Sequence, residues 1–135
     1  MNIFIEETPH IKQCEFFLEK GTTGLMGSSG CGKTTLMNEI FKKYDNIGYL
    51  SQDAPLFDFL TIQENIFISL QILGKQEESD KMIENMELEK CKDTIVKNVS
   101  GGERKRCSIA IEMCNDPSAF LFDEPLSSLD SSTSI

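Results

Sequence analysis

The chain has 135 residues and a formal net charge of −9, which suits one domain and argues against a non-specific nucleic-acid binder. No apolar run approaches the roughly 20 residues of a membrane span, and the acidic start, residues 1–7, lacks the positive charge of a signal peptide. We therefore expect a cytoplasmic protein with a single domain over residues 1–135.

The first predicted elements are a strand, a glycine-rich loop and a helix. Thr22–Met26 is predicted to be a short strand. A helix is predicted over residues 35–41, where four apolar residues share one face: Leu36, Met37, Ile40 and Phe41. The segment between strand and helix fits the phosphate-binding pattern G-x-x-x-x-G-K-[ST]: Gly27, Ser28, Ser29, Gly30, Cys31, Gly32, Lys33 and Thr34.

The residue types of this loop match the chemistry of phosphate binding. Glycines let several backbone N–H groups point into one concavity, where a Cβ would obstruct a phosphate. The helix that follows offers further N–H groups and the positive end of its dipole. Lys33 can reach the β- and γ-phosphates, and the Thr34 hydroxyl can ligate Mg²⁺. The sequence therefore predicts that the chain binds a nucleoside triphosphate.

The middle of the chain is predicted to contain one strand and two helices. Residues 47–50 read as a short strand. Thr61 and Glu64 fit a capping box that opens a helix running to about Leu73, and Gly74 ends it. Ser79 is predicted to cap another short helix, with three apolar residues: Met82, Ile83 and Met86.

A second capping box begins the next helix. Ser100 and Glu103 fit the pattern S-x-x-E, and the helix is predicted to continue to about Cys114. Its predicted apolar positions are Ile109, Ala110 and Met113. A capped helix with no further role would explain this pattern. Against that explanation, Gly101 and Gly102 lie just inside the helix start, and glycine is a poor helix former. A start free of bulky side chains is typical of a helix against which an anion docks.

The last predicted element is a strand with two carboxylates after it. Residues 119–122 are all apolar, as in a strand that is buried on both faces of a parallel sheet. Asp123 and Glu124 follow at the carboxyl end of the strand, where open α/β sheets place ligands. The first is suited to Mg²⁺ and the second to polarising a water molecule; an acidic turn is the alternative.

The five cysteines contain no C-x-x-C pair, and the single histidine, His10, is near none of them. We therefore expect reduced thiols rather than a disulfide scaffold or a zinc site. Cys31, inside the glycine-rich loop, is either an oxidation-sensitive thiol or simply a small side chain that fits there.

Taken in order, these motifs resemble those of the ABC-type ATPase domain, over roughly residues 17–133. They are similar to its Walker A, Q-loop, signature, Walker B and D-loop: Gly27–Thr34, Gln52, Ser100–Arg106, Phe120–Pro125 and Ser128–Asp130. The variant V-S-G-G-E-R-K-R and the tail L-D-S-S-T resemble the G subfamily of half-transporters. The resemblance implies an α/β fold with a mostly parallel sheet flanked by helices, shortened, and with a small helical subdomain within residues 52–100.

The resemblance also implies roles for individual residues. Lys33, Gln52 and Glu124 would serve catalysis, with Glu124 as the base or water-positioner. Mg²⁺ would be held by Thr34, Gln52 and Asp123. The nucleotide would contact Gly27–Thr34, Thr35, Ser100, Gly101, Gly102, Glu103 and Asp130. ATP would lie between one P-loop and the signature of a second such domain, and closure of that dimer would drive a separate transmembrane domain.

Four departures from the family pattern accompany these matches. The only histidine, His10, precedes the P-loop, so it cannot be the switch histidine that follows the D-loop in the family. The intervals from Lys33 to Gln52 and from Gln52 to Ser100 are shorter than usual. Leu126 and Ser128 stand where the G subfamily has Thr and Gly. The aromatic residue that stacks on adenine is left open among Phe4, Phe16 and Phe17.

Two other functions are alternatives to an ATP-hydrolysing transporter subunit. One is an ABC-like binding module with little turnover, for which the missing switch histidine argues. The other is a non-transport ABC ATPase acting on ribosomes or chromosomes, which the net charge of −9 disfavours.

Overall fold

The computed structural model describes residues 2–51 and 56–123. The chain forms two compact units that divide after Ile47. Gln52, Glu124 and Asp130, to which roles were assigned from the sequence, lie outside the described residues. None of the helices in the described ranges is long and apolar enough to span a bilayer.

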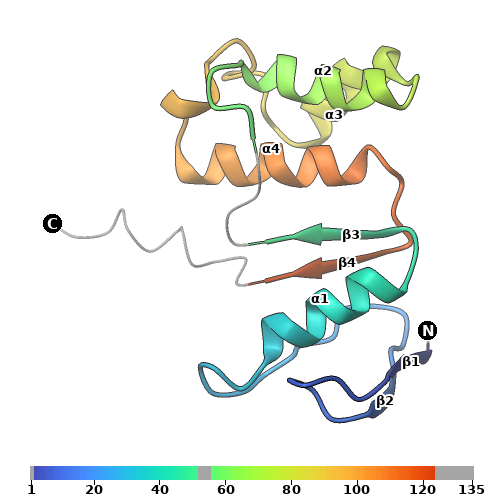
Figure 1. The fold of residues 1–135 in the computed structure, drawn as a ribbon. Helices are drawn as coiled ribbons and strands as arrows, with labels where there is room; N and C mark the ends of the chain where they lie inside the picture. The colour runs from blue at the N-terminus through green and yellow to red at the C-terminus, as the bar shows by residue number, and fades with distance from the viewer. Residues whose placement is uncertain (1, 52–55, 124–135) are drawn as a thin grey trace, which may run out of the picture. The chain divides into compact units, whose positions relative to one another are not determined.

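The first unit consists of a β-hairpin and one helix (Figure 1). Strands β1 (Asn2–Ile5) and β2 (Cys14–Phe17) pair antiparallel, with Ile5 opposite Cys14. Helix α1 spans Lys33–Lys43. Its buried residues are Met37 and Ile40, and those of β1 are Ile3 and Ile5.

The residue after α1 ties this helix to β1. The Tyr44 hydroxyl accepts a hydrogen bond of 2.8 Å from the Phe4 N–H and donates one of 3.4 Å to the Phe4 carbonyl oxygen. The ammonium group of Lys43 lies 4.8 Å from the centre of the Phe4 ring. Phe4 is therefore already engaged in this unit, whereas Phe17 is 68% exposed.

The strand predicted for Thr22–Met26 is not formed. These residues are exposed, and they pair with no strand that the structure describes. A strand is held by ladder hydrogen bonds to a neighbour, and Gly24 in the middle of this segment weakens any tendency to extend. Phe41 also differs from the prediction: it was placed on the apolar face of α1, but it is 44% exposed.

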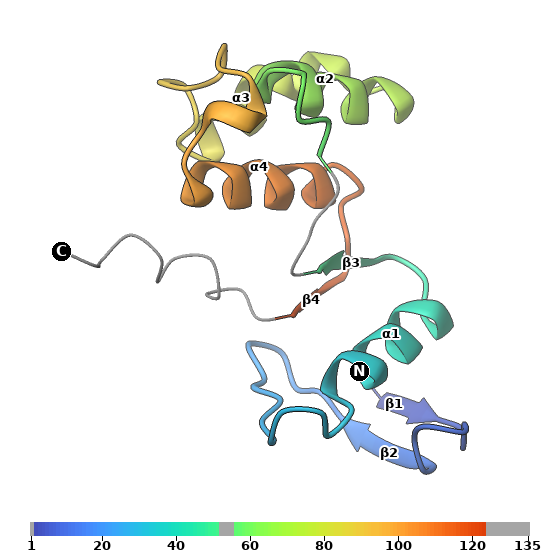
Figure 2. The same cartoon turned by 60° about the vertical axis from the view of Figure 1, so that its left-hand side comes forward.

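The second unit is layered, with helices on one side of a two-stranded sheet. Strand β3 (Ile47–Leu50) begins at the boundary between the units and pairs with β4 (Ala119–Phe122). Both arrows point the same way in Figure 1, so the pair is parallel. Helix α4 (Gly101–Met113) lies between this pair and the α2–α3 layer in both views (Figure 2). The predicted α/β class is confirmed, with the parallel pairing in this sheet.

Helix α2 (Ile62–Ile72) begins and ends where the sequence predicts. Thr61 and Glu64 form the complete capping box, and Gly74 adopts a left-handed φ of 71° after the last turn. The predicted cap of α3 (Ser79–Asn85) is wrong, because a 3-10 turn, η1 (Gln76–Glu78), runs directly into this helix. Ser79 is therefore inside the helix, and its buried hydroxyl makes no hydrogen bond.

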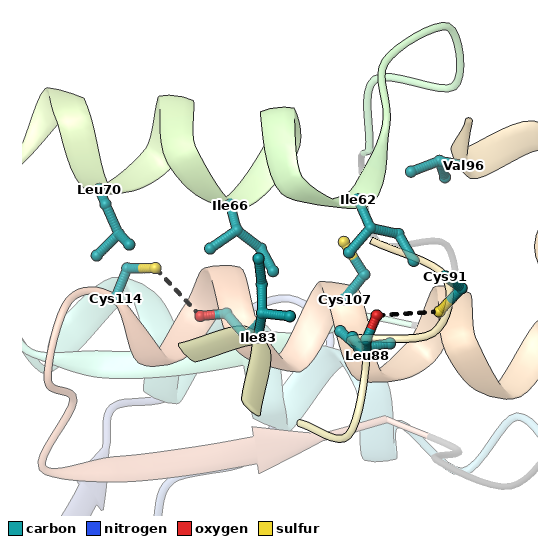
Figure 3. Close-up of a cluster of buried hydrophobic side chains, with 10 residues drawn as sticks. Ile62, Ile66, Leu70, Ile83, Leu88, Cys91, Val96, Cys107 and Cys114 are labelled. Carbon is teal, nitrogen blue, oxygen red and sulfur yellow. Dashed lines mark hydrogen bonds between the residues drawn. The ribbon is translucent and has the colours of Figure 1, made fainter. Parts of the chain in front are cut away.

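The hydrophobic core of this unit lies between α2, α3 and α4 (Figure 3). Residues from several elements form it: Ile62, Ile66, Leu70, Ile83, Leu88, Cys91, Val96, Cys107, Ala110 and Cys114. Ala110 was predicted as an apolar contact, whereas Ile109 and Met113 are only half-buried. Cys107 of α4 and Cys114, which caps the C-terminus of this helix, are both buried in this core.

Strand β4 is not buried on both faces, contrary to the prediction. Its residues are half-buried or exposed, and Phe122 is 43% exposed. Within the described residues, β4 has one neighbouring strand, β3. Burial of both faces requires layers on each side, and the sequence pattern alone does not supply them.

Candidate functional site

The glycine-rich loop of the first unit has the backbone shape that its composition predicts. Gly30 and Gly32 adopt left-handed φ angles of 74° and 95°, which side chains with a Cβ rarely reach. The Cys31 N–H donates a hydrogen bond of 3.3 Å to the Ser28 carbonyl oxygen and closes a tight turn. The loop residues before Gly32 are all exposed, so the backbone curls without burying its own polar groups.

Lys33 folds back over this loop. Its ammonium group donates hydrogen bonds of 3.0 Å to the Gly27 carbonyl oxygen and 2.9 Å to the Ser28 carbonyl oxygen. It also lies 3.9 Å from the Cys31 sulfur. The structure thus brings Gly27, Ser28, Cys31 and Lys33 together.

The N-terminus of α1 differs from those of α2 and α4. Gly32 is its N-cap and provides no side-chain hydrogen bond, and the first turn contains no acidic residue. Helices α2 and α4, in contrast, both begin with a capping box that includes a glutamate. The positive end of the α1 dipole is therefore not offset by a carboxylate of its own first turn, which favours the approach of an anion.

The start of α4 is closed by Ser100 and Glu103. The Ser100 N–H and hydroxyl donate hydrogen bonds of 2.8 and 2.7 Å to the Glu103 carboxylate, and the Glu103 N–H donates one of 3.3 Å to the Ser100 hydroxyl. The Ser100 bonds, chiefly, and the Cys91 thiol lower the pKa of Glu103. The helix start is thus not free of side chains, although Gly101 is exposed.

Asp123 lies where the two parallel strands end. Its N–H donates a hydrogen bond of 3.0 Å to the Leu50 carbonyl oxygen, which joins the ends of β3 and β4. Burial, followed by the nearby charge of Asp123, raises the pKa of Tyr49. The Tyr49 N–H itself donates to the Glu112 carboxylate of α4 at 3.2 Å. The predicted metal-binding carboxylate is therefore at the carboxyl edge of the parallel pair.

Sequence reasoning missed a polar anchor in the second unit. Asn65 is 1% exposed. It accepts a hydrogen bond from the Phe57 N–H and donates to the carbonyl oxygens of Phe57 and Thr61. Asn65 shares a face with Ile62 and Ile66, and an amide on an otherwise apolar face is the signal that could have revealed it.

All five cysteines are free thiols in the structure. Among the described residues, no group of three or more His, Cys, Asp or Glu side chains gathers as a metal site.

Comparisons with known proteins agree with these observations. The family model described as "ABC transporter" matches residues 11–127. "ABC transporter G family member 22" of Arabidopsis thaliana is 35% identical over 145 aligned positions, which cover 82% of this chain and 19% of that protein. "Broad substrate specificity ATP-binding cassette transporter ABCG2" of Bos taurus is 31% identical over 150 positions, which cover 86% of this chain and 23% of that protein.

A bacterial relative covers more of the chain. "Fe(3+) ions import ATP-binding protein FbpC" of Fusobacterium nucleatum is 33% identical over 156 positions, which cover 96% of this chain and 40% of that protein. The chain thus spans less than half the length of these relatives. The alignments, at 145 to 156 positions, exceed the 135 residues of the chain, so the relatives contain segments within the matched region that this chain lacks.

Proposed function

The chain belongs to the ABC transporter family, and on that premise we propose that it binds ATP at its P-loop and hydrolyses it to drive transport by a separate membrane domain. The observation that carries this proposal is the loop from Gly27 to Lys33, with its left-handed glycines and its lysine. The α1 start, which lacks both a side-chain cap and an acidic first turn, supports it further.

ATP binding would exchange the partners of Lys33. In the structure the ammonium group is bonded to the carbonyl oxygens of Gly27 and Ser28. Phosphate oxygens carry more negative charge than carbonyl oxygens and accept stronger, charge-assisted hydrogen bonds. The ammonium group would therefore donate to the β- and γ-phosphates instead. The N–H groups of the loop, together with Thr35 in the first turn of α1, would contact the same phosphates.

Mg²⁺ would be held by oxygen donors, the kind that this cation prefers. These are the Thr34 hydroxyl, the Gln52 amide oxygen and the Asp123 carboxylate. When bound, the metal neutralises part of the phosphate charge. Glu124 would orient a water molecule and accept its proton as the water oxygen bonds to the γ-phosphorus. The bond from that phosphorus to the bridging oxygen breaks, and ADP leaves.

We also propose that a second ABC domain completes the site. Ser100, Gly101, Gly102 and Glu103 would face the nucleotide of the partner domain, and Asp130 would contact the partner across the interface. The membrane domain would be a separate protein or segment, which places this chain at the cytosolic face of a membrane. The G-family names among the relatives support a half-transporter type of partner.

The test is Mg-ATP turnover by the purified chain over a range of protein concentrations, with Glu124→Gln in parallel and ATP binding measured separately on both. Turnover that rises faster than protein concentration and disappears in Glu124→Gln would support a dimerising ATPase. Binding without turnover would favour the binding module. A folded chain that does not bind ATP would refute the proposal.

A further inference from the structure

Two observations fix the register of the parallel strands β3 and β4. The Asp123 N–H donates a hydrogen bond of 3.0 Å to the Leu50 carbonyl oxygen. A Cβ added to Gly48 would lie 2.6 Å from a carbon of the Phe120 ring, so these two residues stand opposite each other. In a parallel pair both observations give the same register along the two strands.

This register places Tyr49 and Asp123 on the same face of the strand pair. Side chains alternate between the two faces of a strand, so residues 49 and 51 of one strand share a face with residues 121 and 123 of the other. Tyr49 is therefore a diagonal neighbour of Asp123, within reach of an aromatic side chain. The charge of Asp123 acts on the Tyr49 phenol and, after burial, is the second cause of its raised pKa.

The backbone that carries the Tyr49 ring is held at both edges of β3. The Tyr49 N–H donates a hydrogen bond of 3.2 Å to the Glu112 carboxylate of α4. The next residue, Leu50, accepts the bond from Asp123 at the opposite edge, because successive backbone groups of a strand point to alternate edges. Tyr49 is therefore bonded to α4 on one edge and, through its neighbour, to β4 on the other.

The Tyr49 hydroxyl is a hydrogen-bond donor at neutral pH. The pKa of an unperturbed tyrosine is already about 10, and burial and the Asp123 charge raise that of Tyr49 further, so the hydroxyl keeps its proton. An ionised carboxylate only accepts hydrogen bonds. The half-buried phenol and the Asp123 carboxylate are therefore complementary partners on one face of the strand pair.

We propose that Tyr49 is a positioning residue, whose hydroxyl donates to the Asp123 carboxylate and orients it for Mg²⁺. This inference rests on the proposed function, in which Asp123 is one of the oxygen donors to the metal. One carboxylate oxygen accepts from the phenol, and the other stays available to the cation. Neighbours that hydrogen-bond to metal-binding carboxylates act in this way, and their loss typically lowers metal affinity by about 10- to 100-fold.

The first experiment measures the Mg²⁺ concentration that half-saturates the Mg²⁺-dependent binding of a fluorescent ATP analogue to the full chain. Tyr49→Phe removes only the hydroxyl and should need about tenfold more Mg²⁺, while its affinity for the same nucleotide in EDTA stays unchanged. Tyr44→Phe is the matched control, because it removes the other phenol hydroxyl of the chain, which bonds the Phe4 backbone. It should leave the Mg²⁺ requirement unchanged.

A merely structural phenol gives a different result. If Tyr49→Phe weakens nucleotide binding equally with and without Mg²⁺, the hydroxyl only supports the fold, and the inference is overturned. An unchanged Mg²⁺ requirement overturns it as well.

Tyrosine emission tests the contact itself, without nucleotide. The chain has two tyrosines and no tryptophan, so in Tyr44→Phe all of the emission comes from Tyr49. A carboxylate that accepts a hydrogen bond from a phenol quenches its emission. Adding Asp123→Asn should therefore raise the emission, whereas Asp93→Asn, at an exposed aspartate of the same unit, should not.

Unchanged emission in Asp123→Asn would show that the hydroxyl does not reach the carboxylate and would overturn the inference. A chain that shows the rise but binds no ATP, with or without Mg²⁺, would instead refute the function proposed for the P-loop, while the contact between Tyr49 and Asp123 would stand.

Discussion

The side-chain ammonium of Lys33 donates a hydrogen bond of 3.0 Å to the carbonyl oxygen of Gly27, so the lysine connects the two ends of its own loop. A second bond, of 2.9 Å, reaches Ser28. The lysine thus folds back over its own loop. In the proposed function, a bound triphosphate would displace these two carbonyl oxygens from the lysine.

Lys33→Ala should lower the ATP affinity about 100-fold or more. Each charge-assisted hydrogen bond to phosphate contributes about 1.5–3 kcal/mol, and the ammonium group can make two. Isothermal titration calorimetry with ATP measures the change. The free energy of unfolding in urea should fall by less than about 1 kcal/mol, because the lysine bonds only exposed loop carbonyls. An unchanged ATP affinity would contradict the assignment of this loop.

Gly27→Ala should also weaken ATP binding, and Cys31→Ala should restore it. A Cβ on residue 27 would lie 2.6 Å from the Cys31 sulfur, which is well inside contact distance. Removing the sulfur in the double variant removes the clash. A double-mutant cycle on ATP affinity should therefore give a coupling of about 1 kcal/mol or more. Independent, additive effects would show that the clash does not determine the loop shape.

Gly32→Ala provides the matched comparison. No atom lies within 4 Å of its added Cβ, but its φ is 95°. The cost is therefore backbone strain of about 1–2 kcal/mol, which Cys31→Ala cannot relieve. Rescue of Gly32→Ala by Cys31→Ala would be inconsistent with this account.

Glu103→Gln should destabilise the fold by about 1 kcal/mol at neutral pH, through the lost half of the capping box. Ser100 lowers the pKa of Glu103 in the folded state. A carboxyl group whose pKa is lowered in the folded state stabilises the fold at pH values above its unfolded pKa, about 4.3. This contribution is lost as the pH falls through the folded pKa. The difference between wild type and variant should therefore be constant from pH 6 to 8 and shrink below about pH 4.

Urea unfolding at each pH measures this difference. Glu89→Gln changes an exposed glutamate of the same unit and controls for net charge. A Glu103 contribution that grows as the pH falls would have the wrong sign for a capping carboxylate.

Asn65→Ala should lower the free energy of unfolding by about 2–4 kcal/mol, because it leaves the Phe57 backbone groups without their buried partner. The loop that carries Asp58 should lose its protection against hydrogen exchange as well. Asn85→Ala, at an exposed position that ends α3, is the control and should cost less than about 1 kcal/mol. A loop that keeps its protection in Asn65→Ala would mean that the other anchors suffice.

The five thiols should differ sharply in reactivity. Cys31 is exposed, whereas burial raises the pKa of Cys107 to about 12 and that of Cys114 to about 11. Iodoacetamide at pH 8 should therefore label Cys31 within minutes and leave Cys107 and Cys114 unlabelled until urea unfolds the chain. Mass spectrometry of digested protein reads out each site. Early labelling of Cys107 would show that the core between α2 and α4 opens in the native state.

Local sequence patterns determined most of the structural features whose partners lie within a few residues of each other in the chain. The capping boxes at Thr61 and Ser100 form as predicted, because both partners of each box lie on the same turn of chain. The left-handed glycines at positions 30 and 32 follow from the motif itself. Helix starts with a capping box and tight turns depend on neighbours in the chain, and sequence reasoning can predict them.

Only the tertiary structure decided the contacts between distant segments. The pairing of Arg104 with Asp58 spans 46 positions, and the contact of Glu112 with Tyr49 spans 63. Ser79 is not the N-cap of α3, because the preceding 3-10 turn runs directly into this helix. Thr22–Met26 does not form a strand, because it pairs with no strand among the described residues. A side chain's partner across space depends on how whole elements pack, and no spacing rule within the chain specifies that packing.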